Sequence, residues 1–331
     1  MPDFQRVLVT GGAGLIGSSL VEHLVDQGCD VVVVDDFSRG RAENLAAVSD
    51  HIEVREGDLE DPGFTSQALG DPVDAVYHLA SRAFGVAYSQ GRHVSILHHN
   101  EAITHNLLTS LAKQPPQWLM VTSSSCVYPD DGPDIIPEMP LFTREPEAVN
   151  WGYGWAKRLL ELKSELFARE TDTSLTIARP FNIFGERYRW AGNFSQAIPM
   201  LVKRVMDGED PVIVWGSGGQ RRSYIHARDC ARMMHALVAA GCDDGPVNLG
   251  TEKTVSMLDL VARIAQAAAR APKIETDPSK PEGRFTKSAE MTRFEGLVPD
   301  FKLDVSLDDG LARMVDWYHA TDFAAPTGLN D

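Results

Sequence analysis

The hydrophobic positions in the first half of the chain form short apolar runs separated by amphipathic stretches. The runs are rich in valine and leucine with few polar interruptions, which is typical of parallel strands buried on both faces. The stretches between them, such as 18–27 and 96–112, predict helices. Strands that alternate with helices predict an α/β fold with a doubly wound, Rossmann-type parallel sheet. The predicted strands are residues 7–10, 31–34, 52–54, 75–79 and 118–121.

The second half of the chain has a less regular pattern. Residues 129–150 are rich in Pro, Asp and Glu and predict a long loop, which a strong helix follows at residues 153–170. Further along, Gly and Pro clusters interrupt the pattern and predict a smaller, mixed C-terminal domain. We therefore divide the chain into a Rossmann domain, residues 1–179, and a second domain, residues 180–331. We expect the segment around 225–250 to return to the main sheet or its edge.

Composition narrows the classes of partner. The chain has 331 residues and a net charge of −16, so its surface repels phosphate backbones and nucleic acid is not an expected partner. No apolar stretch approaches the roughly 18 residues that cross a bilayer, and the N-terminus has no signal-peptide pattern. The 4 cysteines form no CxxC pair or disulfide framework. We expect a cytoplasmic protein with no membrane partner.

A glycine-rich turn follows the first predicted strand. Gly11, Gly14 and Gly17 form a GxxGxxG pattern that runs into a helix. Glycines allow a tight turn and the close approach of a pyrophosphate, which then lies at the helix N-terminus. Asp35 ends the second strand, where a carboxylate accepts hydrogen bonds from both ribose hydroxyls and repels a 2′-phosphate. The turn therefore predicts a dinucleotide site that prefers NAD to NADP.

A second pattern predicts catalytic chemistry. Tyr153 and Lys157 are four residues apart and share one helical face. An ammonium beside a phenol favours the phenolate, so we expect a lowered tyrosine pKa and a role for Tyr153 as a base. The serine-rich turn 122–129 follows a predicted strand and offers a hydroxyl to the same substrate oxygen. Together with the dinucleotide turn, this set predicts an oxidoreductase-type active site.

Seven motifs spread over nearly the whole chain carry a family resemblance. They are GGAGLIG (11–17), GDLED (57–61), HLAS (78–81), SSSCVYP (123–129), YGWAK (153–157), ARPFNIFG (178–185) and WGSGGQRRSYIH (215–226). Taken together they resemble the extended short-chain dehydrogenase/reductases, specifically the nucleotide-sugar epimerases and dehydratases. The resemblance implies that NAD binds to the first domain and that a nucleotide-diphosphate sugar binds to the second.

The resemblance also implies a set of site residues. Ser124, Tyr153 and Lys157 would be the catalytic triad, with the tyrosine taking a proton from a sugar hydroxyl, usually at C4, while a hydride passes to NAD. Ser125 and Asn182 would contact the sugar nucleotide. The substrate diphosphate would bind Arg222, and a further substrate contact would come from Arg284. The residues assigned to the cofactor are Gly11, Gly14, Leu15, Ile16, Gly17, Asp35, Asp58, Leu59, Ala80, Tyr153 and Lys157.

Positions 125 and 126 decide among the chemistries of the family. The 4,6-dehydratases carry Asp-Glu at these positions, and the UDP-glucuronate decarboxylases carry Glu at the second, whereas this chain has Ser125 and Cys126. The local sequence instead resembles GDP-mannose 3,5-epimerases and GDP-fucose synthases, in which the cysteine deprotonates a carbon beside the 4-ketone. A thiolate is a competent base for such a carbon. Since Asp35 argues against NADPH, the sequence favours an NAD-dependent epimerase of a GDP-sugar, with UDP-sugars open.

One departure leaves several mechanisms open. Both of those families pair the cysteine with a His or Lys acid from a loop that corresponds to about 186–197, and here that loop contains neither. Either Tyr188 or an arginine substitutes, or a single centre is inverted, or Cys126 only packs. If Cys126 only packs, a C4-epimerase that uses only Ser124, Tyr153 and Lys157 is expected. Two further functions stay open: a 4-keto-sugar reductase or dehydrogenase with net redox, and a catalytically silent NAD-binding redox sensor.

Three smaller expectations concern the oligomer, metal binding and packing. Helix 153–170 carries additional apolar positions. The family resemblance implies that it forms an intersubunit four-helix bundle of a homodimer with helix 96–112; the alternative is that both apolar stripes serve only the internal core. The histidines at 98, 99 and 105 lack the remaining ligands of a metal shell, so no metal site is expected. We also expect Asn100 to pack against the helix of Tyr153, and His226 to be structural.

Overall fold

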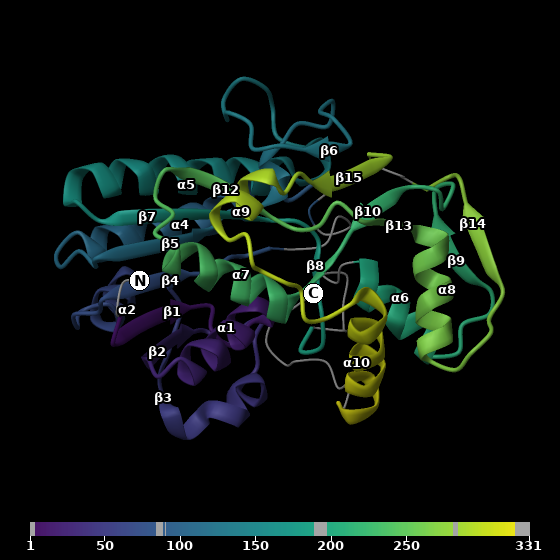
Figure 1. Cartoon of the computed structure of the whole chain (residues 1–331), viewed down its shortest axis with the longest axis horizontal. Helices are drawn as coiled ribbons and strands as arrows, with labels where there is room; N and C mark the ends of the chain where they lie inside the picture. The colour runs from purple at the N-terminus through teal and green to yellow at the C-terminus, as the bar shows by residue number, and fades with distance from the viewer. Residues whose placement is uncertain (1–3, 84–88, 90, 189–196, 281–283, 322–331) are drawn as a thin grey trace.

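The main body of the protein is one parallel sheet. The computed structural model describes residues 4–83, 89, 91–188, 197–280 and 284–321. Within them, seven strands pair in the order β12-β7-β5-β4-β1-β2-β3, all parallel (Figure 1). The strands are β1 (Arg6–Thr10), β2 (Asp30–Asp35), β3 (Ile52–Glu56), β4 (Ala75–His78), β5 (Trp118–Thr122), β7 (Ser174–Pro180) and β12 (Gly245–Leu249). The predicted Rossmann-type α/β fold is confirmed, and the segment at 245–249 returns to the sheet beside β7.

Helices cover both faces of this sheet because alternate strand residues point to opposite sides. Val7 and Val9 belong to the core beneath α1 (Leu15–Asp26) and α7 (Ala227–Ala239). Leu8 belongs to the core on the other face, which α2, α4 and α5 cover. These three helices are α2 (Pro62–Ala68), α4 (His93–Leu111) and α5 (Trp151–Thr171). The inner strands are therefore buried on both faces, as their apolar runs predict, but the prediction is wrong for residues 52–54, because β3 is the edge strand and Val54 is 44% exposed.

A third core lies at the C-terminal end of the sheet strands. It gathers α6 (Ala197–Met206), α8 (Met257–Ala267) and α10 (Leu307–Ala320) around a two-stranded parallel sheet (Figure 1). That sheet consists of β9 (Val212–Trp215) and β14 (Ile274–Asp277). This part forms the smaller, mixed region expected after the Rossmann domain.

A small four-stranded sheet connects the two halves of the chain. Its order is β13-β10-β15-β6, and a separate pair joins β8 (Ile183–Phe184) to β11 (Ile225–His226). The four strands are β6 (Ile135–Ile136), β10 (Arg221–Ser223), β13 (Thr254–Ser256) and β15 (Thr286–Ala289). The expectation that 129–150 is loop throughout is therefore wrong: β6 pairs with β15, more than 140 residues later, and a short 3₁₀ turn follows at Ala148–Asn150. A two-residue strand is too short to leave a pattern in sequence.

The remaining elements are short. They are the 3₁₀ segments η1 (Ala42–His51) and η2 (Ser125–Val127), and the helix α9 (Thr292–Leu297). Among the described residues, no helix combines the length and apolarity needed to cross a bilayer.

Candidate active site

The glycine turn between β1 and α1 is packed tightly enough to exclude side chains. Gly11 has φ +69°, and a Cβ there would lie 2.7 Å from the backbone N of Ala80. A Cβ on Gly17 would lie 2.1 Å from the carbonyl oxygen of Gly11. Helix α1 begins at Leu15, between Gly14 and Gly17, so the unpaired N–H groups of its first turn lie beside these glycines. This arrangement of glycines and a helix N-terminus fits a pyrophosphate.

Asp35 lies at the end of β2 and is tied to the same turn. Its carboxylate accepts hydrogen bonds from the backbone N of Ala13 at 2.8 Å and of Phe37 at 2.9 Å. Burial raises the pKa of this carboxyl, while these two N–H groups oppose the shift. The buried carboxylate next to the glycine turn fits an NAD ribose, with the hydroxyl-accepting oxygens the cofactor requires.

The adenine side of the turn contains a residue that the sequence patterns did not single out. The Arg82 guanidinium forms ion pairs with Asp58 at 2.9 Å and Asp36 at 3.1 Å. Asn100 is buried on α4, which packs against the helix of Tyr153, and it accepts a hydrogen bond from the Ser81 hydroxyl at 2.7 Å and donates to the carbonyl of Arg82 at 3.1 Å. The Arg82 guanidinium therefore holds Asp58 in place, and Asn100 fixes the loop that carries Arg82. HLAS directly precedes Arg82, but the motif itself gives no sign of this ion pair.

The predicted triad is assembled at one place. The Ser81 and Ser124 side chains interact with the Tyr153 phenol and favour its ionised form, against the larger effect of burial. The Lys157 Nζ lies 5.6 Å from the centroid of the Tyr153 ring and donates to the carbonyl of Thr122 at 2.8 Å. Burial lowers the pKa of Lys157 to about 8. The expected lowering of the Tyr153 pKa is wrong for the protein alone, because burial raises it.

Two glycines on either side of Tyr153 let α5 approach the catalytic turn. A Cβ on Gly152 would lie 2.3 Å from the His93 carbonyl oxygen, and one on Gly154 would lie 2.6 Å from that of Cys126. Further along the helix, Arg158 donates through Nε at 3.0 Å and Nη2 at 2.6 Å to the carbonyl of Val127. The helix is thus locked against the turn.

Cys126 faces charged side chains that no sequence motif connects with it. Its thiol interacts electrostatically with the Glu147 carboxylate, and Asn150 Nδ2, which donates to Glu147 at 2.5 Å, lies 3.7 Å from the sulfur. Glu147 also accepts from Lys287 Nζ at 2.5 Å. Burial, with Glu147 adding to it, raises the pKa of Cys126 to about 12. The resting group is therefore a thiol, which must lose its proton before it can act as a base.

The 186–197 loop, where an acid is expected, is described only in part. Residues 189–196 lie outside the described residues, and Tyr188 is buried. Glu186 bonds His226 at 2.7 Å, and His226 caps α7, which agrees with a structural histidine. A lysine does reach the surroundings of Cys126, but it is Lys287 from β15. No local spacing connects residues 126 and 287, so no sequence pattern could have found this contact.

The predicted substrate residues lie on neighbouring strands and turns. Asn182 has φ +41° and donates to the Ser223 carbonyl at 2.9 Å, and Ser125 is buried in the catalytic turn. Arg222 pairs in register with Lys287 across β10 and β15. Arg284 donates to backbone carbonyls, including Thr286 at 2.8 Å and Pro129 at 3.2 Å. Its guanidinium therefore fastens the 129–133 segment, and its substrate role stays a prediction.

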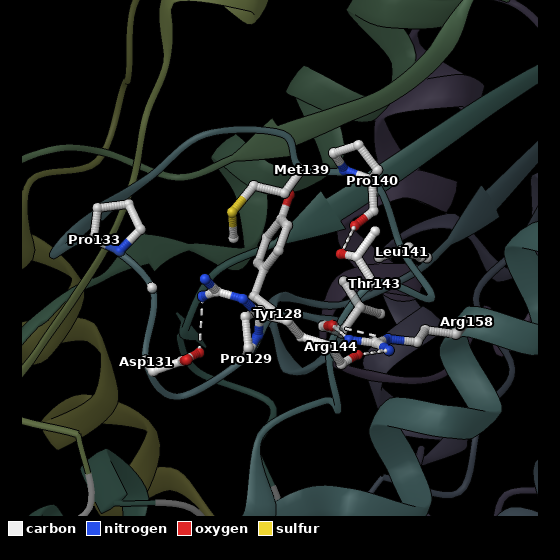
Figure 2. A pocket seen from close by; sticks show the side chains of 12 residues that line it. Tyr128, Pro129, Asp131, Pro133, Met139, Pro140, Leu141, Thr143, Arg144 and Arg158 are labelled. Atoms are coloured by element: carbon white, nitrogen blue, oxygen red, sulfur yellow. Dashed lines mark hydrogen bonds and ion pairs between the residues drawn. The ribbon is translucent and has the colours of Figure 1, made fainter.

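A cavity of about 350 Å³ lies beside the catalytic turn. It is lined by residues of 127–144 and by Arg158, with Tyr128 and Met139 side chains pointing into it (Figure 2). An exposed ion pair of Arg144 with Asp131, 3.0 Å apart, lies at its edge. None of the predicted triad lines it, so this hollow is separate from the catalytic groups.

Known proteins resemble this chain in sequence and in fold. The model of the NAD dependent epimerase/dehydratase family matches residues 7–250. UDP-glucuronic acid decarboxylase 1 of Arabidopsis thaliana is 30% identical over 94% of this chain and 69% of its own length. dTDP-4-dehydro-6-deoxy-D-allose reductase of a Streptomyces species is 26% identical over 95% and 96%. The Thermus thermophilus UDP-glucose 4-epimerase complex with NAD superposes with a TM-score of 0.79 at 25% identity, covering 96% of this chain and 100% of that one.

Proposed function

The chain belongs to the NAD-dependent epimerase/dehydratase family, and on that premise we propose that it epimerises a nucleotide-diphosphate sugar through a transient 4-keto intermediate. The predicted cofactor, NAD, is that of the family and of a solved relative. Gly11, Gly14, Leu15, Ile16 and Gly17 would hold its pyrophosphate. NAD, when bound, accepts a hydride from the sugar and returns it. We assign cofactor binding to residues 1–179 and sugar-nucleotide binding to 180–331.

The meeting of Tyr153, Ser124 and Lys157 at one point is the observation that carries the proposal. The phenol of Tyr153, which interacts with the Ser81 and Ser124 side chains, is where a sugar hydroxyl would release and regain its proton. Lys157 lies close enough to the ring to stabilise the phenolate that this exchange creates. The Ser124 hydroxyl also accepts from the backbone N of Cys126 at 3.1 Å, which fixes its direction.

Cys126 favours inversion at a carbon beside the ketone. It is partly exposed, and it follows Ser124 by two residues in the same turn. A 4-ketone acidifies the neighbouring C3 and C5 hydrogens, so an acid–base group beside the reacting carbonyl has a defined task. The resemblance around Cys126 makes a GDP-sugar the first choice, whereas the relatives described above act on UDP- and dTDP-sugars.

The oligomer belongs to the same proposal. Helices α4 and α5 pack side by side, and α5 keeps Leu162 37% and Leu166 48% exposed while Leu160 and Phe167 are buried. We propose that the exposed pair takes part in a four-helix bundle between two copies. Sedimentation velocity should show a dimer that Leu162→Glu with Leu166→Glu converts to a monomer.

The decisive experiment is a substrate panel in D₂O. GDP-, UDP- and dTDP-linked hexoses and UDP-glucuronate are incubated with the protein and NAD, and products are followed by NMR and mass spectrometry. Deuterium at C3 or C5 in an epimerised sugar supports the proposal in full. An epimer without deuterium supports C4 inversion and leaves Cys126 to packing. Net consumption of NAD or NADH, or release of CO₂, would overturn epimerisation.

Two variants make the panel specific. Tyr153→Phe removes the proton-transferring oxygen and should lower turnover by about 10²–10⁴-fold. Tyr318→Phe removes the same atom from a partly buried tyrosine whose hydroxyl donates to Asp207 and should leave turnover unchanged. Equal activity in the two variants would contradict the role of Tyr153.

A further inference from the structure

A buried ion pair lies against the Cys126 thiol. The carboxylate of Glu147 accepts hydrogen bonds from Lys287 Nζ at 2.5 Å and from Asn150 Nδ2 at 2.5 Å, and the same Asn150 nitrogen lies 3.7 Å from the Cys126 sulfur. Side-chain exposure is 9% for Lys287 and 10% for Glu147. Charges this well buried are costly unless they are paired, so the pair is a built feature of the fold.

Three distant segments converge to build this cluster. Cys126 comes from the catalytic turn, Glu147 from the N-cap of the 3₁₀ turn Ala148–Asn150, and Lys287 from β15. Arg222 is the register partner of Lys287 across β10 and β15, so the two side chains leave the same face of that sheet. The four-stranded sheet therefore brings a lysine to the turn that carries Ser124 and Cys126.

The residue types in the cluster differ in what they do with protons. A lysine ammonium gives up its proton when its surroundings change, whereas an arginine does not. A carboxylate in contact with both a thiol and an ammonium can receive a proton from either. The groups that face Cys126 are Glu147, Lys287 and, from α5, Tyr153 and Lys157.

We propose that Cys126, Glu147 and Lys287 form a second acid–base set, in which Glu147 passes protons between the thiol and the lysine, and Lys287 is the acid that the 186–197 loop does not supply. This inference rests on the proposed function, because NAD must first create the ketone that acidifies the neighbouring carbon. It assigns Lys287 and Glu147 to a site for which the sequence motifs supply only Cys126.

The proton count closes within the set. Glu147 takes the thiol proton, and the thiolate then removes the proton from carbon, so that the C–H electron pair moves into the enolate and an S–H bond forms. The Lys287 ammonium, which contacts Glu147 rather than the thiol, protonates that carbon and becomes a neutral amine. Glu147 then returns its proton to Lys287. The thiol, carboxylate and ammonium are restored, and the new C–H proton derives from an exchangeable group.

The first test needs no substrate. Iodoacetamide alkylation of Cys126, followed by mass spectrometry between pH 7 and 10, reports how much thiolate is present. We expect Glu147→Gln to speed alkylation at pH 8 at least about tenfold, since a negative charge leaves while the ammonium stays, and Lys287→Met to slow it by a similar factor. The double variant should lie between them. Profiles that all overlay the wild-type profile would overturn the coupling of these groups.

A second test uses the substrate found in the panel. Lys287→Met should still form the transient NADH absorbance but should lose at least about tenfold of deuterium incorporation at C3 or C5. Cys126→Ser should behave likewise. If Cys126→Ser loses incorporation and Lys287→Met keeps it, the relay is wrong and the epimerase proposal stands. If no sugar reacts, the proposed function fails and the alkylation profiles alone judge the coupling.

The same variants also provide the control for folding. Glu147→Gln keeps the shape of the side chain, and the double variant Glu147→Gln with Lys287→Met contains no unpaired buried charge. Thermal unfolding of each variant shows whether it is folded at the assay temperature. A folded double variant with wild-type deuterium incorporation would overturn the relay.

Discussion

Two buried ion pairs flank the catalytic turn, and they are built differently. In one, Arg179 contacts Glu161 through Nε at 2.9 Å and Nη2 at 2.6 Å, and both side chains are 2–3% exposed. Arg179 Nη1 also bonds the Tyr128 hydroxyl at 3.0 Å, and the Ser123 hydroxyl donates to Glu161. The other pair is Glu147 with Lys287, where the third partner of the carboxylate is a thiol.

The two ion pairs differ in whether they can exchange protons. The Arg179 pair continues into a closed network, since the Tyr128 hydroxyl donates to Asn248 at 2.6 Å and Asn248 donates to the Ile136 carbonyl at 2.9 Å. An arginine keeps its proton throughout, so this network fixes the turn without exchanging protons. The lysine pair contacts a group that titrates. One pair therefore holds the turn in place, and the other is equipped to move protons at it.

The largest effect is expected from breaking the arginine pair. Glu161→Gln leaves the Arg179 guanidinium buried without a counter-ion, and the free energy of unfolding should fall by about 3–5 kcal/mol. Urea unfolding followed by tryptophan fluorescence measures this loss. Glu161→Met with Arg179→Met removes both charges and should recover much of it. A loss below about 1 kcal/mol in Glu161→Gln would contradict a supporting role.

The corresponding change in the lysine pair is Glu147→Gln. It should lower the free energy of unfolding by less than Glu161→Gln does, and the loss should depend on pH. In the wild type, burial would lower the pKa of Lys287, but Glu147 and Cys126 raise it above 10.5, so the charged lysine stabilises the fold below that pH. In Glu147→Gln burial dominates and the folded pKa falls below the unfolded one. The unfolded chain then binds more protons between about pH 8 and 10, so stability relative to the wild type rises with pH.

At pH 7 we expect Glu147→Gln to lose about 1–3 kcal/mol, because the lysine escapes the penalty by releasing its proton. Urea unfolding at pH 7, 8, 9 and 10 measures the difference from the wild type. Glu161→Gln provides the control, since its arginine stays charged and its difference should be flat over this range. Parallel curves for the two variants would mean that the pairs do not differ in kind.

Sequence patterns predict the sheet and the triad far better than the cluster of Cys126, Glu147 and Lys287. The strand runs, the glycine turn and the Tyr153–Lys157 spacing are local, because periodicity and fixed offsets follow from helix and strand geometry. The parallel sheet, the position of Asp35 beside the glycine turn and the meeting of Ser124, Tyr153 and Lys157 were therefore predictable. The position of Lys287 was not, because β15 reaches the catalytic turn through pairing with β10 and β6, which are far away in sequence. Burial likewise decided the pKa directions of Tyr153 and Cys126, and burial is a tertiary property.

A smaller effect should come from the glycine that lets α5 reach the turn. The added methyl group of Gly154→Ala would lie 2.6 Å from both the Cys126 carbonyl oxygen and Pro146 Cβ. The variant should lose about 1–3 kcal/mol of unfolding free energy and should alter Cys126 alkylation at pH 8. Gly296→Ala is the matched control, because a Cβ there meets nothing within 4 Å. If both variants unfold alike, the close packing at Gly154 carries no strain.

The smallest effect should come from an ion pair on the surface. Arg263 Nη1 lies 2.8 Å from both carboxylate oxygens of Asp308, but the side chains are 44% and 65% exposed. Water already solvates these charges, so Arg263→Met should change the free energy of unfolding by less than about 1 kcal/mol, measured by the same urea titration. A loss as large as that of Glu161→Gln would show that stability responds to any lost charge pair. Burial would then no longer explain why the two pairs at the catalytic turn differ, and the comparison would have to rest on the alkylation of Cys126 alone.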